Sequence, residues 1–269
     1  MMISLMSTKN IILFGQTGAG KSSVVNLMTG QQRARTSSGT ERCTTHWEAH
    51  SIDIDGSIFR VFDTIDLQEY QLGMKEYLDA IENAYTLIKK LKDEGGIHLL
   101  LFCVRAGRFT STIPNNYRLF YECLCEKKVP IVLVLTGLER EQRMDDWWTK
   151  YKSTFDKYDI VVDNHACITA IDGPDETQRK LYEESGRLVR NLVTHCTSTD
   201  DGYKVDDGSK GGKKSKWSNE WLKMFISKLL ELLPGNHTMK KKDIVHVLTE
   251  RCGMPQQAAE QLAKQIKLK

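Results

Sequence analysis

The sequence lacks a long apolar run, and no stretch approaches the roughly 18 apolar residues of a membrane-spanning helix. Residues 1–10 are too short and too weakly apolar a stretch to form a secretory signal peptide. We therefore expect a protein that is neither exported nor embedded in a bilayer.

Regular cysteine spacing is also absent. The seven cysteines form an odd, irregular set, which is typical of reduced thiols and predicts a location in the cytosol or the nucleus. Cys123 and Cys125 lie too close together, and too far from other ligands, to suggest a zinc site. The set is Cys43, Cys103, Cys123, Cys125, Cys167, Cys196 and Cys252.

A strong excess of one charge is missing too. The net charge of +3 argues against a dedicated nucleic-acid binder. The charge is uneven, because residues 203–269 carry 14 Lys or Arg against 7 Asp or Glu, which leaves −4 for the rest. The 269 residues allow one large domain with a small appendage, and the apolar content of 40% is enough to form a core.

Short apolar runs alternate with segments of helical periodicity, and this order predicts an α/β fold with a mostly parallel, doubly wound sheet. Asp55-Gly56 predicts a tight turn that joins two antiparallel strands. The expected strands are 11–14, 47–53, 57–62, 97–104, 131–135 and 166–170, and the expected helices are 21–28, 69–91, 115–125, 145–158 and 176–196.

The C-terminal part differs in composition. Residues 199–216 are rich in Gly, Ser, Asp and Lys and predict a flexible linker between a domain at 1–198 and a helical extension at 217–269. Residues 217–233 have an apolar helical face with nearby lysines, which fits either packing on the main domain or contact with an anionic membrane. Residues 243–266 predict two short helices broken at 253–255, and such a pair could bind another protein.

The segment Gly15-Gln16-Thr17-Gly18-Ala19-Gly20-Lys21-Ser22 fits the pattern G-x-x-x-x-G-K-[ST], between an expected strand and an expected helix. Glycines let successive backbone N–H groups converge on phosphate, and the helix N-terminus adds its positive dipole end. We expect Lys21 to reach the β- and γ-phosphates and the hydroxyl of Ser22 to ligate Mg²⁺.

Asp63 ends the second hairpin strand, where P-loop proteins hold Mg²⁺. GTPases continue this motif as D-x-x-G, but the fourth residue here is Asp66, which bears on switching and hydrolysis more than on binding. A glutamine that orients the attacking water often follows directly, whereas this chain has Leu67 there and Gln68 one residue later. These departures predict slow intrinsic turnover.

A threonine hydroxyl that senses the γ-phosphate and ligates Mg²⁺ is expected in the loop before the hairpin. Thr44 and Thr45 are the candidates. The alternative is that this pair simply begins a strand.

Base recognition is predicted after the strand 131–135, where GTPases write [NT]-K-x-D and the chain has Thr136-Gly137-Leu138-Glu139. Glu139 can accept hydrogen bonds from guanine N1 and N2, while Gly137 replaces the lysine whose stem covers the base. Thr169 and Ala170 end the later expected strand, 166–170, and are a plausible substitute for the usual Ser-Ala pair beside the base edge.

These motifs resemble the GIMAP, or immune-associated nucleotide-binding, GTPases, and most closely the GIMAP-like proteins of fungi. The similar segments are 15–23, 40–43, Asp63-Thr64 with Leu67, and 107–110, the last being a box typical of the family. The resemblance spans roughly 9–196.

The resemblance implies a septin-like, three-layer P-loop G domain that binds GTP or GDP with Mg²⁺, often near membranes. Such domains pair nucleotide to nucleotide, so a homodimer could place Arg108 against the partner's phosphates as an arginine finger; alternatively, Arg108 caps local structure. The residues predicted to hold nucleotide are Gly15, Gln16, Thr17, Gly18, Ala19, Gly20, Lys21, Ser22, Ser23, Thr136, Glu139, Thr169 and Ala170.

The function that these observations favour is guanine-nucleotide binding with slow, dimer- or partner-assisted hydrolysis, used as a switch or an assembly scaffold. The alternative is a scaffold that binds GTP or GDP and never hydrolyses it. A P-loop ATPase or small-molecule kinase would need an Arg-rich lid or an acidic pair after a strand, and the sequence shows neither clearly.

Overall fold

The computed structural model describes residues 8–30, 47–64, 74–107, 109–198, 240–252 and 256–265. Its centre is a six-stranded sheet in the order β2-β3-β1-β4-β5-β6. All neighbouring pairs are parallel except β2 and β3. The strands are β1 (Lys9–Gly15), β2 (Trp47–Ile54), β3 (Ser57–Thr64), β4 (Leu99–Arg105), β5 (Ile131–Thr136) and β6 (Asn164–Cys167).

The antiparallel hairpin forms as its turn residues predict. Asp55 and Gly56 both have positive φ, at 52° and 82°, which matches the right-handed twist of the two strands. The carboxylate of Asp53 accepts a hydrogen bond from the N–H of Gly56 at 2.8 Å. The hairpin sets β3 beside β1, where the hydroxyl of Thr64 donates to the carbonyl of Leu13 at 2.9 Å.

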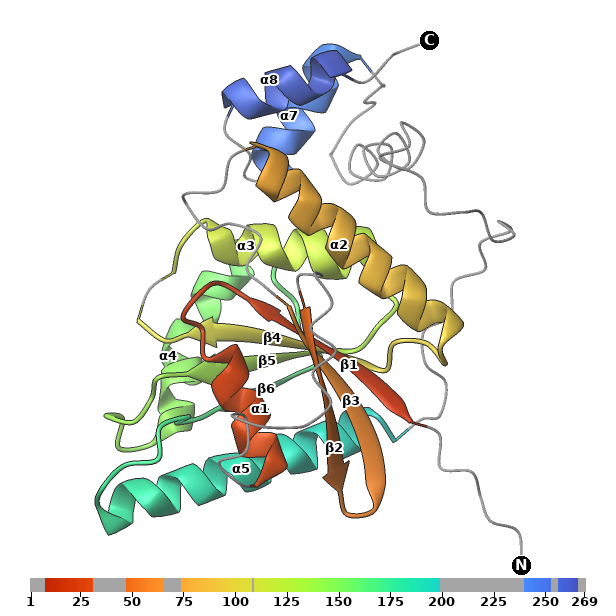
Figure 1. Ribbon diagram of the computed structural model, residues 1–269. Helices are drawn as coiled ribbons and strands as arrows, with labels where there is room; N and C mark the ends of the chain where they lie inside the picture. Colours follow the sequence, from red (N-terminus) through yellow and green to blue (C-terminus); the bar gives the residue numbers. More distant parts are fainter. Residues whose placement is uncertain are drawn as a thin grey trace, which may run out of the picture.

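Helices cover both faces of the sheet, which makes three layers (Figure 1). Apolar side chains of α1 and α5 pack on one face, and those of α2, α3, η1 and α4 pack on the other. The α/β, mostly parallel fold expected from the sequence is confirmed. The helices of these layers are α1 (Lys21–Thr29), α2 (Met74–Asp93), α3 (Thr112–Tyr117), η1 (Arg118–Leu124), α4 (Met144–Asp156) and α5 (Glu176–Cys196).

The helix after β4 differs from the expected single helix at 115–125. It begins at Thr112 as α3 and changes at Arg118 into the π-helix η1. The N–H of Cys125 bonds the carbonyl of Phe120, five residues earlier, at 3.0 Å. Within this wider turn, Phe120 stacks on Phe14 of β1, with ring centroids 4.6 Å apart.

β6 is shorter than expected, because it ends at Cys167 and not at Ala170. The N–H of Thr169 bonds the hydroxyl of Ser185 on α5 at 3.1 Å, so it is not available to a neighbouring strand. The residues after Cys167 therefore form a loop at the edge of the sheet.

The C-terminal helix pair packs on the main domain. α7 (Lys241–Cys252) lies against α3 and η1, and α8 (Gln256–Gln265) lies against α7. The two helices are drawn in blue at the top of Figure 1. Ile244, Val247 and Leu248 are fully buried in the same apolar cluster as one face of the sheet. The expected helix at 217–233 and the linker lie outside the described residues. None of the helices in the described ranges is long and apolar enough to cross a bilayer.

Candidate nucleotide-binding site

The phosphate loop begins at a glycine that no other residue could replace. Gly15 ends β1 with φ at +145°, and a Cβ atom there would lie 2.1 Å from the carbonyl oxygen of Cys103 on β4. β1 and β4 cannot move apart without breaking their parallel pairing, so a side chain at position 15 would clash with β4 and only glycine fits there.

The loop is fastened at its middle to the neighbouring strand. Thr136, the last residue of β5, donates its buried hydroxyl to the carbonyl of Ala19 at 2.8 Å. A Cβ atom at Gly20 would lie 3.3 Å from Thr136, so glycine permits this close approach. Thr136 was predicted as a nucleotide contact, and the structure places it directly under the phosphate loop.

The ammonium of Lys21 lies inside the loop. It donates hydrogen bonds to the carbonyls of Gly15 at 3.0 Å and of Gln16 at 3.3 Å. Lys21 also begins α1, so its charge adds to the positive end of the helix dipole. The loop therefore presents a cation and a helix N-terminus together, which is an anion-binding arrangement.

The two predicted Mg²⁺ ligands within the described residues meet each other. The hydroxyl of Ser22 on α1 donates to the carboxylate of Asp63 on β3 at 2.8 Å. Burial raises the pKa of Asp63 above its usual value, while the Ser22 hydroxyl and the ammonium of Lys21 act in the opposite direction. A hydroxyl oxygen and a carboxylate oxygen are ligands that Mg²⁺ prefers.

The two predicted base-reading loops lie side by side. The N–H of Leu138 donates to the carbonyl of Ile168 at 3.4 Å, which joins the loop after β5 to the loop after β6. One carboxylate oxygen of Glu139 is buried and has no hydrogen-bond partner within the described ranges. Thr169 is buried and Ala170 is half-buried in the adjacent loop.

Arg105 was not predicted to belong to this site. It ends β4 beside Thr136, and its side chain crosses Gly137, where a Cβ atom would lie 3.2 Å from the Arg105 Cγ. The arginine stem therefore runs over the position at which GTPases carry lysine. Sequence reasoning missed it because Arg105 and Gly137 are far apart in the chain.

The box at 107–110 contacts the phosphate loop. The hydroxyl of Thr110 donates to the side-chain oxygen of Gln16 at 3.0 Å. Gln16 was predicted as a nucleotide contact, and this bond orients its side chain. The metal-ligand candidate Thr44 and the catalytic candidates Thr45, Gln68 and Arg108 all lie outside the described residues and stay predictions.

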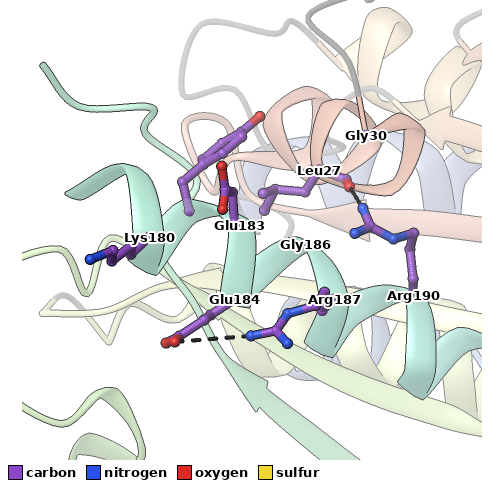
Figure 2. A pocket seen from close by; sticks show the side chains of 9 residues that line it. Leu27, Gly30, Lys180, Glu183, Glu184, Gly186, Arg187 and Arg190 are labelled. Atoms are coloured by element: carbon purple, nitrogen blue, oxygen red, sulfur yellow. Dashed lines mark hydrogen bonds and ion pairs between the residues drawn. The ribbon is translucent and has the colours of Figure 1, made fainter. Parts of the chain in front are cut away.

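A separate hollow of about 560 Å³ lies between α1 and α5 (Figure 2). It is lined by Gly30 at the far end of α1, away from the phosphate loop, and by charged side chains of α5. Arg190 donates to the carbonyl of Leu27 at 2.7 Å and so bonds the C-terminal turn of α1. Because the hollow lies at the opposite end of α1, it is not the phosphate site.

Comparison with known proteins identifies the family. The model of the AIG1 family matches residues 9–181. The chain belongs to the AIG1 family. This match confirms the resemblance that the motifs indicate, whereas the placement of the AIG1 chain nearest to fungal proteins stays a prediction.

Two relatives come from Arabidopsis thaliana. Immune-associated nucleotide-binding protein 7 is 26% identical over 74% of this AIG1 chain and 67% of its own length. Immune-associated nucleotide-binding protein 10 is 28% identical over 52% of this chain and 31% of its own length. Among solved structures, the bacterial dynamin GTPase LeoA from ETEC has a TM-score of 0.51 at 14% identity and covers 71% of this chain and 36% of its own, a likeness that shows the shared fold.

Proposed function

We propose that this AIG1 protein binds GTP and GDP with Mg²⁺ and hydrolyses GTP slowly, as a switch or an assembly scaffold. One observation carries the proposal: a phosphate loop fastened to Thr136 lies beside a buried Glu139 oxygen that has no partner within the described residues. Guanine has an N1–H and an N2–H₂ group, both hydrogen-bond donors, whereas the corresponding edge of adenine offers an acceptor. The names of the Arabidopsis relatives, immune-associated nucleotide-binding proteins, support nucleotide binding.

The residues fit the cation as well as the nucleotide. Mg²⁺ would be held by the oxygens of Ser22 and Asp63, with Thr44 or Thr45 as a further ligand, and bound Mg²⁺ would neutralise charge on the phosphates. Lys21 would turn from the loop carbonyls toward the β- and γ-phosphates, since it loses only neutral acceptors by doing so.

The base would lie against the side chain of Arg105. The guanidinium and its stem would cover one ring face, in place of the lysine that Gly137 lacks. Glu139 would accept from the base edge, and the half-buried Ala170 would limit the space beside it. Glu139 would then provide the specificity for guanine. The side chain that covers the base would come from β4, whereas most GTPases supply it from the segment after β5.

Slow turnover follows from the residues after Asp63. By its place in the motif, Asp66 would put a negative charge where a glycine N–H usually meets the γ-phosphate, and the apolar Leu67 cannot orient water. Gln68 is the remaining candidate for that role. We propose that hydrolysis is assisted by pairing of two chains across the nucleotide face, with Arg108 supplied to the partner's phosphates.

The test is a titration of the purified protein, with Mg²⁺, against fluorescent GTP, GDP and ATP analogues. Tight binding of both guanine nucleotides with ATP ignored is the expected result, and a preference for ATP would overturn the proposal. Lys21→Ala should abolish binding, while Lys180→Ala, an exposed lysine of α5 in an exposed ion pair, should leave it unchanged. Tight binding by Lys21→Ala would contradict the assignment of the phosphate site.

A scaffold that binds guanine nucleotide without hydrolysis is the second candidate, and the Asp66-Leu67 pair favours it. Single-turnover assays over a range of protein concentrations separate the two. A rate that rises with protein concentration and falls in Arg108→Ala supports paired hydrolysis. No phosphate release at any concentration supports the scaffold.

For the chain as a whole we propose a G domain at 1–198, a linker at 199–216 and a helical extension at 217–269, with a cytoplasmic location. The packing of α7 on α3 and η1 supports an extension that is attached to the domain. The basic residues between 213 and 228 support a peripheral contact with anionic membranes.

A further inference from the structure

Three side chains of types that bind metal ions converge outside the nucleotide site. One carboxylate oxygen of Asp145, one ring nitrogen of His165 and the sulfur of Cys167 all lie within 4.8 Å of one another. Asp145 belongs to the first turn of α4, and the other two belong to β6. None of them takes part in the phosphate loop, the Ser22–Asp63 pair or the contacts of Glu139.

The local structure explains why they meet. His165 and Cys167 are two residues apart on one strand, so their side chains point to the same face of the sheet. α4 packs on that face, and Trp148 stacks on the His165 ring with centroids 4.6 Å apart and planes 26° apart. Asp145 lies one turn before Trp148 and therefore reaches the same place. The stacking fixes the ring orientation of His165.

We propose that Asp145, His165 and Cys167 form a binding site for a zinc-like divalent transition-metal ion. Sulfur, imidazole nitrogen and carboxylate oxygen are the three donor types that Zn²⁺ takes, and Mg²⁺ does not favour the first two. In a tetrahedral site the bond lengths put ligand atoms about 3.3–3.8 Å apart. Cys167 is buried and His165 is partly buried, so the exposed Asp145 side chain is the one that would close the remaining distance.

The fourth position would be open to water or a small anion. The described residues supply three ligands here, and a site with three protein ligands leaves Zn²⁺ one exchangeable position. Because Asp145 is exposed, solvent reaches the site from its side. The ion would thus join the start of α4 to β6 and keep one coordination position for an exogenous ligand.

Protonation sets how the ion would bind. Burial lowers the pKa of His165, with Asp145 and Lys152 acting on it from α4, so its imidazole is a neutral ligand at neutral pH. Burial, and then the charge of Asp145, raises the pKa of Cys167 to about 12, so the thiol keeps its proton until an ion displaces it.

The site lies directly behind the loops that carry the proposed base readers. Asp145 follows Glu139 by six residues, and Cys167 precedes Thr169 by two. An ion that joins α4 to β6 would keep the ends of the two loops that carry Glu139 and Thr169 at a constant distance from each other. The metal site does not depend on the proposed nucleotide chemistry, because all three ligands are present without it.

Cobalt(II) titration of the metal-free full chain, without nucleotide, tests the proposal. Cobalt(II) bound to a thiolate gives a sulfur-to-metal charge-transfer band, which the all-oxygen Ser22–Asp63 pair cannot produce. We expect this band to saturate at one equivalent and to disappear when Zn²⁺ displaces cobalt. Cys167→Ser should lose the band and Cys196→Ser, a half-buried cysteine of α5, should keep it.

A second variant keeps the test decisive if Cys167→Ser does not fold. Asp145→Asn changes an exposed side chain and should weaken cobalt binding by about tenfold or more, since a ligand contributes at least as much as an outer-shell partner. No charge-transfer band at several-fold excess of cobalt overturns the proposal. So does a band that persists in Cys167→Ser, or an unchanged affinity in Asp145→Asn. The cluster would then serve only as a hydrogen bond from the Cys167 thiol to Asp145.

Discussion

The hydroxyl of Thr136 donates to the carbonyl of Ala19 at 2.8 Å, so the first residue of the predicted base-reading segment also holds the phosphate loop. The bond is buried and the two residues are 117 positions apart. Two parts of the site that the sequence presents as separate motifs are therefore one structural unit.

Replacing Thr136 by Val should loosen the phosphate loop. The variant keeps the side-chain shape but leaves the Ala19 carbonyl without its donor, which costs about 1–3 kcal/mol for a buried group. We expect a lower melting temperature and weaker binding of GTP and GDP alike, measured by calorimetry and titration. Thr136→Ser keeps the donor and should behave close to the natural protein, and an equal loss in both variants would contradict the role of the bond.

Two glycines of the phosphate loop should respond very differently to alanine. At Gly15 the new Cβ meets the Cys103 carbonyl, and we expect a loss of about 3 kcal/mol or more in the free energy of unfolding. At Gly18 no atom of the described residues lies within 4 Å of the added Cβ, so only the positive φ of 75° is strained, at about 1–2 kcal/mol. Urea denaturation of both variants measures the difference. Equal losses would contradict the close approach of β1 and β4.

Glu139→Gln should reduce discrimination between bases. A hydrogen bond to a charged acceptor contributes about 1.5–3 kcal/mol, so GTP affinity should fall roughly tenfold to a hundredfold while ATP affinity stays unchanged. Inosine triphosphate, which lacks the N2 amino group, is the matched ligand. The natural protein should prefer GTP over it, and the variant should not; an unchanged preference would exclude Glu139 as the base reader.

Asp63→Asn should change the stability of the protein and its binding of Mg²⁺ in opposite directions. Burial raises the folded-state pKa of Asp63, so the folded state binds the proton more tightly than the unfolded chain does. Stability from this group is present below the unfolded pKa and is lost as pH rises through the folded pKa, so ionised Asp63 is destabilising at neutral pH. The variant keeps an acceptor for Ser22 and removes the charge.

We therefore expect an equal or higher melting temperature at neutral pH for nucleotide-free Asp63→Asn, together with a loss of Mg²⁺-dependent GTP affinity. Melting curves with and without Mg²⁺ and GTP give both readouts. A variant that is destabilised without ligand and still binds Mg²⁺-GTP as the natural protein does would contradict both parts.

Arg105→Ala should weaken nucleotide binding by about twofold to fivefold, the effect of removing a cation from an exposed ring face. Arg105→Met retains an unbranched apolar stem over Gly137 and should recover part of the loss. Fluorescence titration of both variants provides the comparison, and since Arg105 is exposed, the melting temperature should not change. Unchanged affinity in Arg105→Ala would remove it from the site.

Much of this site could be predicted because single segments carry its chemistry. The glycine spacing of 15–22 and the Asp55-Gly56 turn act through local backbone geometry, which the sequence displays directly. Asp63 could be paired with Ser22 because parallel strands end at one edge of the sheet. Both residues were predicted as Mg²⁺ ligands, and the structure brings their side chains together; their role in binding Mg²⁺ stays a prediction.

Other features depend on contacts that no local pattern encodes. In η1 the backbone hydrogen bonds span five residues and not four. The spacing of apolar residues in 115–125 still fits an ordinary helix, so the sequence pattern does not reveal this change. β6 ends early because Ser185, from a helix later in the chain, takes the N–H of Thr169. Arg105 over Gly137, and Asp145 beside His165, join residues whose proximity arises only when the sheet is assembled.

The docking of α7 on α3 and η1 has a practical side. Ile244, Val247 and Leu248 are fully buried, so α7 contributes to the hydrophobic core of the domain and is not merely attached to its surface. A truncated protein that ends after α5 would expose the apolar surface that α7 covers and would tend to self-associate through it. Dimerisation studies on this protein are therefore interpretable only with the full chain, in which that face is already covered.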